Sequence, residues 1–165
     1  MRKIKISILV AICLALVSCK YTFSGASYGT AKTVSIDFFQ NLAPIVVPTL
    51  STTFTEGLKD KFIQQTPLEM VTRDADLSFE GEIRDYSVMS KAVTAQEVAA
   101  QNRLTITTHV KFRNRIDDKW SFDQNFSAYE DYDSSSSLSS VQDDLIETIV
   151  EKLINDIFNA SDANW

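Results

Sequence analysis

Hydrophobic and polar residues alternate along several stretches of the chain, and this period of two is typical of strands with one buried face. The alternating stretches are residues 33–40, 77–90, 102–114 and 120–128, with a short extended stretch at 68–72. In the longest of them, Leu104, Ile106 and Val110 point to one side, whereas the residues between them are polar or basic. A short turn joins residues 102–114 to the next stretch, so the pattern predicts an antiparallel hairpin with one solvated face.

The first of these stretches covers residues 33–40. Val34, Ile36 and Phe38 share one parity, with Ser35 and Asp37 between them. The pattern predicts a strand over residues 33–40 that buries the three apolar side chains on one face.

Two other stretches repeat their apolar residues every three or four positions, which predicts amphipathic helices. The first covers residues 49–65 and ends before Pro67, and the second runs from Val141 to about Phe158. Helices with one apolar face and a sheet with one apolar face can bury each other. We therefore predict an α+β fold in which residues 33–165 form a single domain. It is a two-layer sandwich, with two amphipathic helices packed on one face of a mostly antiparallel sheet of about four strands.

Local signals refine this prediction. Ser139 with Gln142, or Ser140 with Asp143, forms a capping box at the start of the second helix. Residues 91–101 are less regular and are predicted to form a loop that projects from the sheet.

Two glycines stand inside predicted elements. Gly57 costs the first helix about 1 kcal/mol relative to Ala, so either another element packs closely on its backbone or it is a tolerated surface residue. Gly81 lies within a predicted strand and indicates a β-bulge there.

The N-terminus has the pattern of a secretory signal. Basic residues among the first five precede an apolar run over residues 6–17, which is too short for a membrane-spanning helix of about 20 residues. Leu16-Val17-Ser18-Cys19 resembles the bacterial lipobox, in which the Cys thiol receives the diacylglyceryl group before cleavage. We predict a lipoprotein signal peptide over residues 1–18, lipidation of Cys19, and a lipidated tether over residues 19–32. The alternative is a simple signal peptide in which Cys19 is incidental.

Several acyl chains on Cys19 would hold the protein stably at a membrane. Lys20 follows the predicted anchor, and residues 21–31 contain no acidic side chain that would direct a lipoprotein elsewhere. The predicted location is therefore the outer membrane, with the protein lipid-anchored on the periplasmic side.

Composition and charge exclude several classes of protein. The chain has 165 residues, 44% hydrophobic and 23% charged, as one globular domain does. Of 16 basic residues, three lie in the predicted signal peptide, so 22 acidic residues leave a net charge of -9 from Cys19 onwards. This charge argues against nucleic acid as a partner. Cys13 and Cys19 are the only cysteines in the sequence, too few for a disulfide framework or a cysteine zinc cluster.

Motifs of known catalytic chemistry are missing from the sequence. It contains no GxSxG elbow, HExxH, P-loop or GxGxxG. The only His, His109, falls on the polar side of a predicted strand, where a solvated residue is favoured over a general base. Paired acids such as Asp117-Asp118 and Asp143-Asp144 lack the spacing of a calcium loop. We therefore expect no enzymatic activity, no cofactor and no metal site.

The charges are unevenly distributed along the chain. Residues 91–116 carry a net charge of +4, whereas residues 117–165 carry -10. Arg103, Lys111 and Arg113 share the polar side of one predicted strand and could bind phosphate groups of a phosphorylated glycolipid. The alternative is that these cations balance acids on neighbouring strands, such as Glu80, Glu82 and Asp123.

An ordered set of short motifs across the whole mature chain resembles the lipopolysaccharide-assembly lipoprotein family, the E component of the lipopolysaccharide transport system. Besides the lipobox, the motifs are SIDFF at 35–39, PTLS at 48–51, FTEGLKD at 54–60, LSFEGEI at 77–83, NRLTI at 102–106, and the stretch from Tyr129 through the acidic helix to Phe158. The match rests on this order, since each motif alone is short.

The resemblance implies a function and partners. Members of this family plug an outer-membrane β-barrel, the D component of the same system, help it to assemble and assist delivery of lipopolysaccharide to the outer leaflet. A compact domain with a polar sheet face suits a water-filled barrel lumen. The competing hypothesis is a freestanding periplasmic lipoprotein, either a pilotin-like binding module or a ligand carrier, because a fold of this kind serves many functions.

Overall fold

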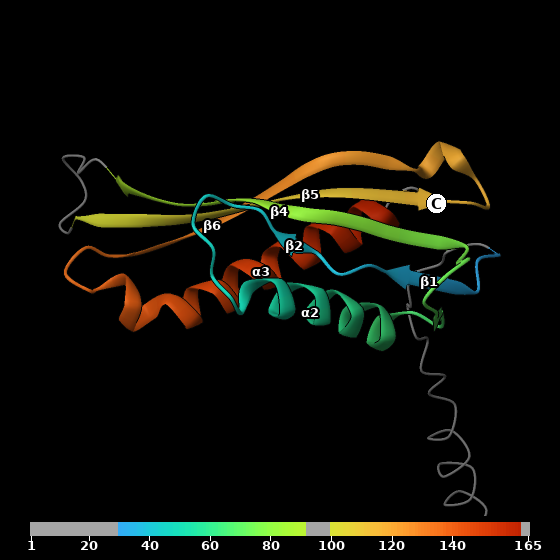
Figure 1. Ribbon diagram of the computed structural model, residues 1–165, viewed down its shortest axis with the longest axis horizontal. Coiled ribbons are helices and arrows are strands. Elements are labelled where there is room, and N and C mark those ends of the chain that lie inside the picture. Colours follow the sequence, from blue (N-terminus) through green and yellow to red (C-terminus); the bar gives the residue numbers. More distant parts are fainter. Residues whose placement is uncertain (1–29, 92–99, 163–165) are drawn as a thin grey trace, which may run out of the picture.

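The computed structural model describes residues 30–91 and 100–162. Along the chain the elements are β1 (Thr33–Ile36), β2 (Gln40–Asn41), α2 (Leu50–Gln65), β3 (Glu69–Met70), β4 (Leu77–Lys91), β5 (Gln101–Asn114), the short 3-10 helix η1 (Asp118–Trp120), β6 (Phe122–Asp133) and α3 (Leu138–Asp162). Both α-helices lie on the same face of the sheet, and α3 runs beneath the length of the long strands (Figure 1). The predicted α+β two-layer sandwich is confirmed.

The sheet is larger and more mixed than predicted. It has six strands in the order β3-β1-β4-β5-β6, and β2 pairs with β4 beside β1. The long strands β4, β5 and β6 are antiparallel, as the predicted hairpin requires, whereas β1 and β2 pair with β4 in parallel. A parallel neighbour needs a crossover connection, and α2 supplies it between β2 and β4.

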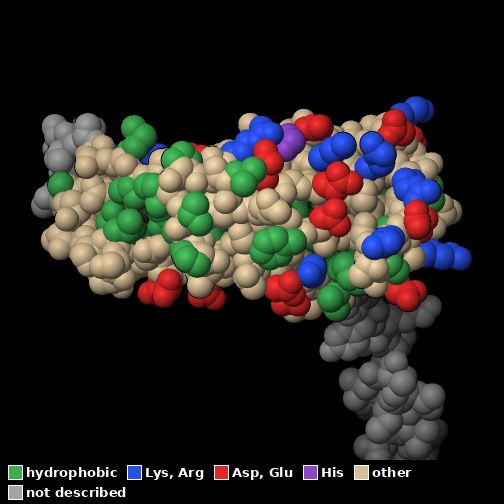
Figure 2. Space-filling model, viewed as in Figure 1, with side chains coloured by type: hydrophobic (Ala, Val, Ile, Leu, Met, Phe, Trp, Pro, Cys, Tyr) green, Lys and Arg blue, Asp and Glu red, His purple; other side chains and the backbone are tan. Residues whose placement is uncertain are grey.

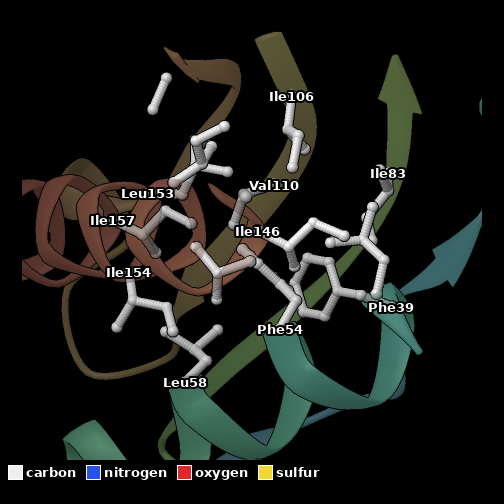
Figure 3. Close-up of a cluster of buried hydrophobic side chains, with 14 of the residues drawn as sticks. Phe39, Phe54, Leu58, Ile83, Ile106, Val110, Ile146, Leu153, Ile154 and Ile157 are labelled. Carbon is white, nitrogen blue, oxygen red and sulfur yellow. The ribbon is translucent and has the colours of Figure 1, made fainter. Parts of the chain in front are cut away.

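The core fills the space between the sheet and the two helices (Figure 3). Aromatic rings run through it: Phe39 lies 4.9 Å from Phe54, and Phe79 lies 4.6 Å from Phe112 between ring centroids. The apolar stripe predicted for the second helix is buried in this layer, through Leu145, Ile146, Ile149, Val150, Leu153, Ile154, Ile157 and Phe158. Burial of both helical stripes against one sheet face is the main source of stability.

The strand predicted over residues 33–40 is interrupted, and the prediction that Phe38 is buried is wrong. Phe38 is 56% exposed, whereas Phe39 is fully buried. The chain leaves β1 after Ile36, and the backbone N–H of Phe39 donates to the buried Thr55 Oγ1 at 3.1 Å. This bond to α2 replaces a strand partner and turns the Phe39 ring into the core.

The two glycines have different roles from one another. A Cβ on Gly57 would lie 2.8 Å from Ile154 Cδ1, so the close approach of another element is confirmed. The bulge predicted at Gly81 is instead between Ile83 and Asp85. A Cβ on Gly81 would lie 2.5 Å from the Phe39 ring and 2.1 Å from the carbonyl oxygen of His109, so the glycine makes room for both.

Two element starts also differ from the predictions. Helix α3 begins at Leu138, so Ser139 and Ser140 lie inside its first turn and neither is the cap of a capping box. The Ser140 backbone N–H instead donates to the Ser137 carbonyl at 3.0 Å. Strand β6 begins at Phe122 because residues 118–120 form the 3-10 turn η1.

None of the helices in the described part of the chain is long and apolar enough to cross a membrane. Four expectations lie wholly or mostly on residues that the structure does not describe: the signal peptide over residues 1–18, the lipidated Cys19, the tether over residues 19–32, and the loop predicted at 91–101.

Candidate functional site

Strand β5, which lies between β4 and β6, carries the predicted cations on the face of the sheet that points away from the helices. Acids on the neighbouring strands lie opposite two of them, Lys111 and Arg103. Lys111 is in register with Glu80 of β4 and with Asp123 of β6. Arg103 is in register with Asp131 of β6. The cations of β5 therefore lie between two strands that carry acids on the same face. This arrangement is expected if the cations serve to balance acids on neighbouring strands.

Arg103 is held in place by β6. Its Nε donates to Asp131 Oδ1 at 2.7 Å and its Nη2 donates to Asp131 Oδ2 at 3.0 Å. The guanidinium also lies 3.6 Å from the centroid of the Tyr129 ring, within cation–π range. The bidentate hydrogen bonds lower the pKa of Asp131 and raise the pKa of Arg103. Lys91 Nζ adds a second cation at 3.4 Å from Asp131 Oδ2.

His109 is also paired across the sheet. Its Nε2 lies 2.6 Å from Asp123 Oδ1, and the next acid on β4, Glu82, pairs with Arg84 at 2.9 Å. His109 is thus a partly exposed strand residue on the polar face, with its ring nitrogen held by a surface carboxylate.

Lys111 and Arg113 lie at the other end of β5 from Arg103. Among the residues that the structure describes, neither of them forms an ion pair with an acid. Ten residues of strand separate Arg113 from Arg103, which is about 33 Å at the usual rise. The three predicted phosphate contacts therefore form two separate places on the face: one at Arg103, and one at Lys111 and Arg113.

Arg113 lines a shallow cavity of about 550 Å³ with two arginines that the sequence analysis did not single out. Arg73 comes from the turn between β3 and β4, and Arg115 follows β5 directly. The acids of the cavity are Asp37, Asp74 and Glu80, and Arg115 Nη1 lies 3.7 Å from Asp74 Oδ1. At this end of the molecule basic and acidic side chains are interspersed (Figure 2). Because Arg73 and Arg113 are 40 positions apart, only the register of the sheet brings them together.

A groove of about 420 Å³ lies between α2 and α3. Its lining includes Asp60 and Lys61 of α2 and Glu147 and Glu151 of α3. Lys61 bridges the two helices, because its Nζ donates to Asn155 Oδ1 at 2.7 Å. Charged and apolar side chains both line the groove, since Val150 and Ile154 of α3 also reach it. Within the described residues no group of three or more His, Cys, Asp or Glu side chains is placed to hold a metal ion.

Solved structures with the same fold come from several bacteria. A minor lipoprotein from Acinetobacter baumannii superposes with a TM-score of 0.55 at 13% identity, over 81% of this chain and 94% of that chain. A hypothetical protein from Chlamydia trachomatis gives a TM-score of 0.55 at 10% identity, over 81% and 99% of the two chains. A protein from Xanthomonas campestris gives 0.51 at 11% identity, over 80% and 85%. At these identities the likeness shows the fold.

The sequence itself matches none of the curated proteins. It does match a family model, that of the lipopolysaccharide-assembly family, over residues 31–161. This match begins just before β1 and ends within the last turn of α3, so it covers every strand and helix described above. The chain therefore belongs to the lipopolysaccharide-assembly family.

Proposed function

We propose that the protein is an outer-membrane lipoprotein that plugs and helps to assemble the β-barrel translocon for lipopolysaccharide. This translocon inserts lipopolysaccharide into the outer leaflet of the outer membrane. The observation that carries the proposal is the family match over residues 31–161, which spans the whole folded domain. The barrel, the D component of the same transport system, is the partner that this family membership suggests.

The outer sheet face supports a position inside a barrel lumen, which is polar and filled with water. Some of its charged side chains are paired, as Arg103 is with Asp131, and the His109 ring nitrogen lies 2.6 Å from Asp123 Oδ1. Between these pairs the face carries hydroxyl groups, and Thr107 Oγ1 donates to Ser127 Oγ at 3.0 Å. Hydroxyl groups both donate and accept hydrogen bonds, so this face can meet a polar wall directly or through water.

The lipid on Cys19 is the proposed membrane attachment, on the periplasmic side of the outer membrane. A tether of about a dozen residues would join it to β1, which begins at Thr33. Tethering raises the local concentration of the domain at a membrane-embedded partner and favours the complex without any further contact.

Phosphate groups of lipopolysaccharide are the proposed ligands of the basic end of β5. Lys111 and Arg113 have no acidic partner in the described structure, so they can bind an anion without losing an ion pair. Arg103 would have to exchange Asp131 for the phosphate. We therefore place the stronger contact at Lys111 and Arg113.

A freestanding ligand carrier is the competing function. Carriers of lipids enclose their apolar ligands, and ligand pockets are mainly lined by apolar side chains. The groove between α2 and α3 is open and has acidic and basic residues in its lining, so it does not favour this function.

Depletion tests the proposed function in cells. When expression is switched off, the proposal expects lipopolysaccharide to decrease at the cell surface and the outer membrane to become permeable to large hydrophobic antibiotics. Surface lipopolysaccharide is measured by labelling intact cells, and permeability is measured by antibiotic sensitivity. Normal surface lipopolysaccharide after full depletion would exclude a role in the translocon.

A further inference from the structure

One edge of the sheet is only half covered. Strands β1 and β2 pair with β4 along Leu77–Ile83, and the last backbone bond of this row runs from the Leu42 N–H to the Ile83 carbonyl at 2.9 Å. Beyond it, the second half of β4, residues 85–91, pairs with β5 on one side. On its other side no strand is present among the described residues.

The direction of the backbone groups at this free edge follows from the register. The Phe79 and Ile83 carbonyls accept bonds from the β1–β2 side, and both side chains face the core. Core-facing residues of one strand direct their N–H and C=O groups to the same side. After the bulge, the core-facing positions are those opposite Ile106 and Leu104, namely Tyr86 and Val88. Their N–H and C=O groups therefore point out of the sheet at the free edge.

Exposed apolar side chains surround this edge. Leu42, Ile45 and Val46 of the β2–α2 loop, together with Val88 and Met89 of β4, are between 38% and 68% exposed. We call these five residues the apolar rim. Hydrophobic side chains gather over this loop and the end of β4 on the face shown in Figure 2. An exposed apolar patch beside unpaired strand groups is the usual site for addition of a strand from another chain.

We propose that residues 85–91 of β4, together with the apolar rim, bind an extended, uncharged segment of the barrel partner as an added strand. The proposal rests on the function proposed above and names the edge that meets the barrel. Main-chain hydrogen bonds to Tyr86 and Val88 give the affinity, and the rim takes alternate apolar side chains of the added segment.

Charge and hydrogen bonding favour this occupant over two others. Binding of a second copy of this chain is disfavoured by charge. Each chain carries a net charge of -9 from Cys19 onwards, and like charges repel. The bilayer is opposed by the backbone of this edge, because hydrocarbon offers no hydrogen-bond partner to the outward N–H and C=O groups of Tyr86 and Val88.

Photo-crosslinking in cells tests the edge with the full lipidated chain. A benzophenone amino acid replaces Met89 or Val46, and mass spectrometry identifies the crosslinked peptide. The control position is Ile63 of α2, which is 57% exposed but lies outside the rim. We expect crosslinks from Met89 and Val46 to one segment of the barrel, and none to this segment from Ile63. Crosslinks to a second copy of the chain would overturn the proposal.

Two variants measure the contribution of the edge. Val88→Pro removes an outward N–H and leaves the bonds to β5 intact, and Val88→Thr is its matched control. We expect Val88→Pro to reduce recovery of the barrel by up to about tenfold, the effect of losing one hydrogen bond, with Val88→Thr unchanged. Ile45 lies in a loop, so Ile45→Asp should reduce recovery of the barrel without unfolding the domain. Ile63→Asp, outside the rim, should leave recovery of the barrel unchanged.

The outcomes separate this proposal from the proposed function. If the wild-type protein recovers the barrel, and neither the rim crosslinks nor the variant effects are seen, the edge proposal fails and the function stands. If the wild-type protein recovers no barrel, both fail.

Discussion

Gly57 of α2 lies directly against Ile154 of α3, because a Cβ atom at residue 57 would stand 2.8 Å from Ile154 Cδ1. Ile154 is only 6% exposed, so its side chain has little room to move away. The close contact explains why a residue that weakens an isolated helix is found in the middle of α2. The absence of a side chain at residue 57 lets the two helices pack tightly beneath the sheet.

We predict that Gly57→Ala and Ile154→Val compensate for each other. Alanine raises the helix propensity of α2 by about 1 kcal/mol but overpacks the helix contact, whereas Ile154→Val alone costs about 0.5–1.5 kcal/mol. Removal of Cδ1 relieves the contact, so the double variant should be more stable than the sum of the two changes by about 0.5–2 kcal/mol. Urea unfolding of the four proteins measures this coupling. Additive effects would show that the two residues do not compete for space.

The pair of Arg103 and Asp131 predicts a pH dependence of stability. The pKa of Asp131 is lower in the folded protein than in the unfolded chain, so the ionised carboxylate stabilises the fold above the unfolded value near 3.8. This contribution is lost as the pH falls through the lowered pKa of the folded state. The wild type should therefore be more stable than Asp131→Asn at pH 7, and the difference should disappear in strong acid. Urea unfolding at several pH values measures it, and a difference that does not change with pH would contradict the pairing.

Substitution of the β5 cations tests the proposed phosphate contacts. Replacing Arg103, Lys111 and Arg113 together with Gln should weaken binding to purified lipopolysaccharide, and the loss should be larger at low salt because exposed charges are then least screened. Lys111→Gln with Arg113→Gln should account for most of the loss, since Arg103 is held by Asp131. Binding is measured by titration at two salt concentrations. If the triple variant binds as the wild type does, the cations serve only to balance neighbouring acids.

Cys19→Ala tests the predicted lipidation. Without the thiol no diacylglyceryl group can be attached, so the variant should not incorporate labelled palmitate. It should also leave the membrane fraction. Metabolic labelling and fractionation of the cells measure these two properties. Labelled palmitate in the variant would exclude Cys19 as the lipidated residue.

Local periodicity predicted the helices and the long strands because each of these elements buries one face along its whole length. Leu145, Ile149 and Leu153 recur every four residues, and all three are buried on α3. The parallel pairing of β1 and β2 with β4 could not be predicted in this way. It depends on the crossover through α2, and the same alternating residues would suit an antiparallel partner equally well.

Errors at single residues have identifiable causes. The alternation of residues 33–40 placed Phe38 inside, but the bond from the Phe39 N–H to Thr55 Oγ1 turns the next ring inward instead. Gly81 suggested a bulge because glycine in a strand often marks one. Its actual neighbours, the Phe39 ring and the His109 carbonyl, come from distant parts of the chain.

The outer face was predictable from parity, but its pairing was not. Alternation along β5 correctly placed Arg103, Lys111 and Arg113 on the polar side. That Asp131 binds Arg103, and that Arg73 lies near Arg113, depends on strand order and register. The apolar rim gave no periodic signal, because part of it lies in a loop between β2 and α2.

Affinity purification of the lipidated, tagged protein from detergent-solubilised outer membrane tests the proposed function most directly. Mass spectrometry then identifies and quantifies the proteins recovered with it. We predict that one large β-barrel of the lipopolysaccharide transport system is recovered at near-equal stoichiometry. Recovery of the protein alone from the membrane fraction would contradict the proposal and would leave a freestanding periplasmic binding lipoprotein.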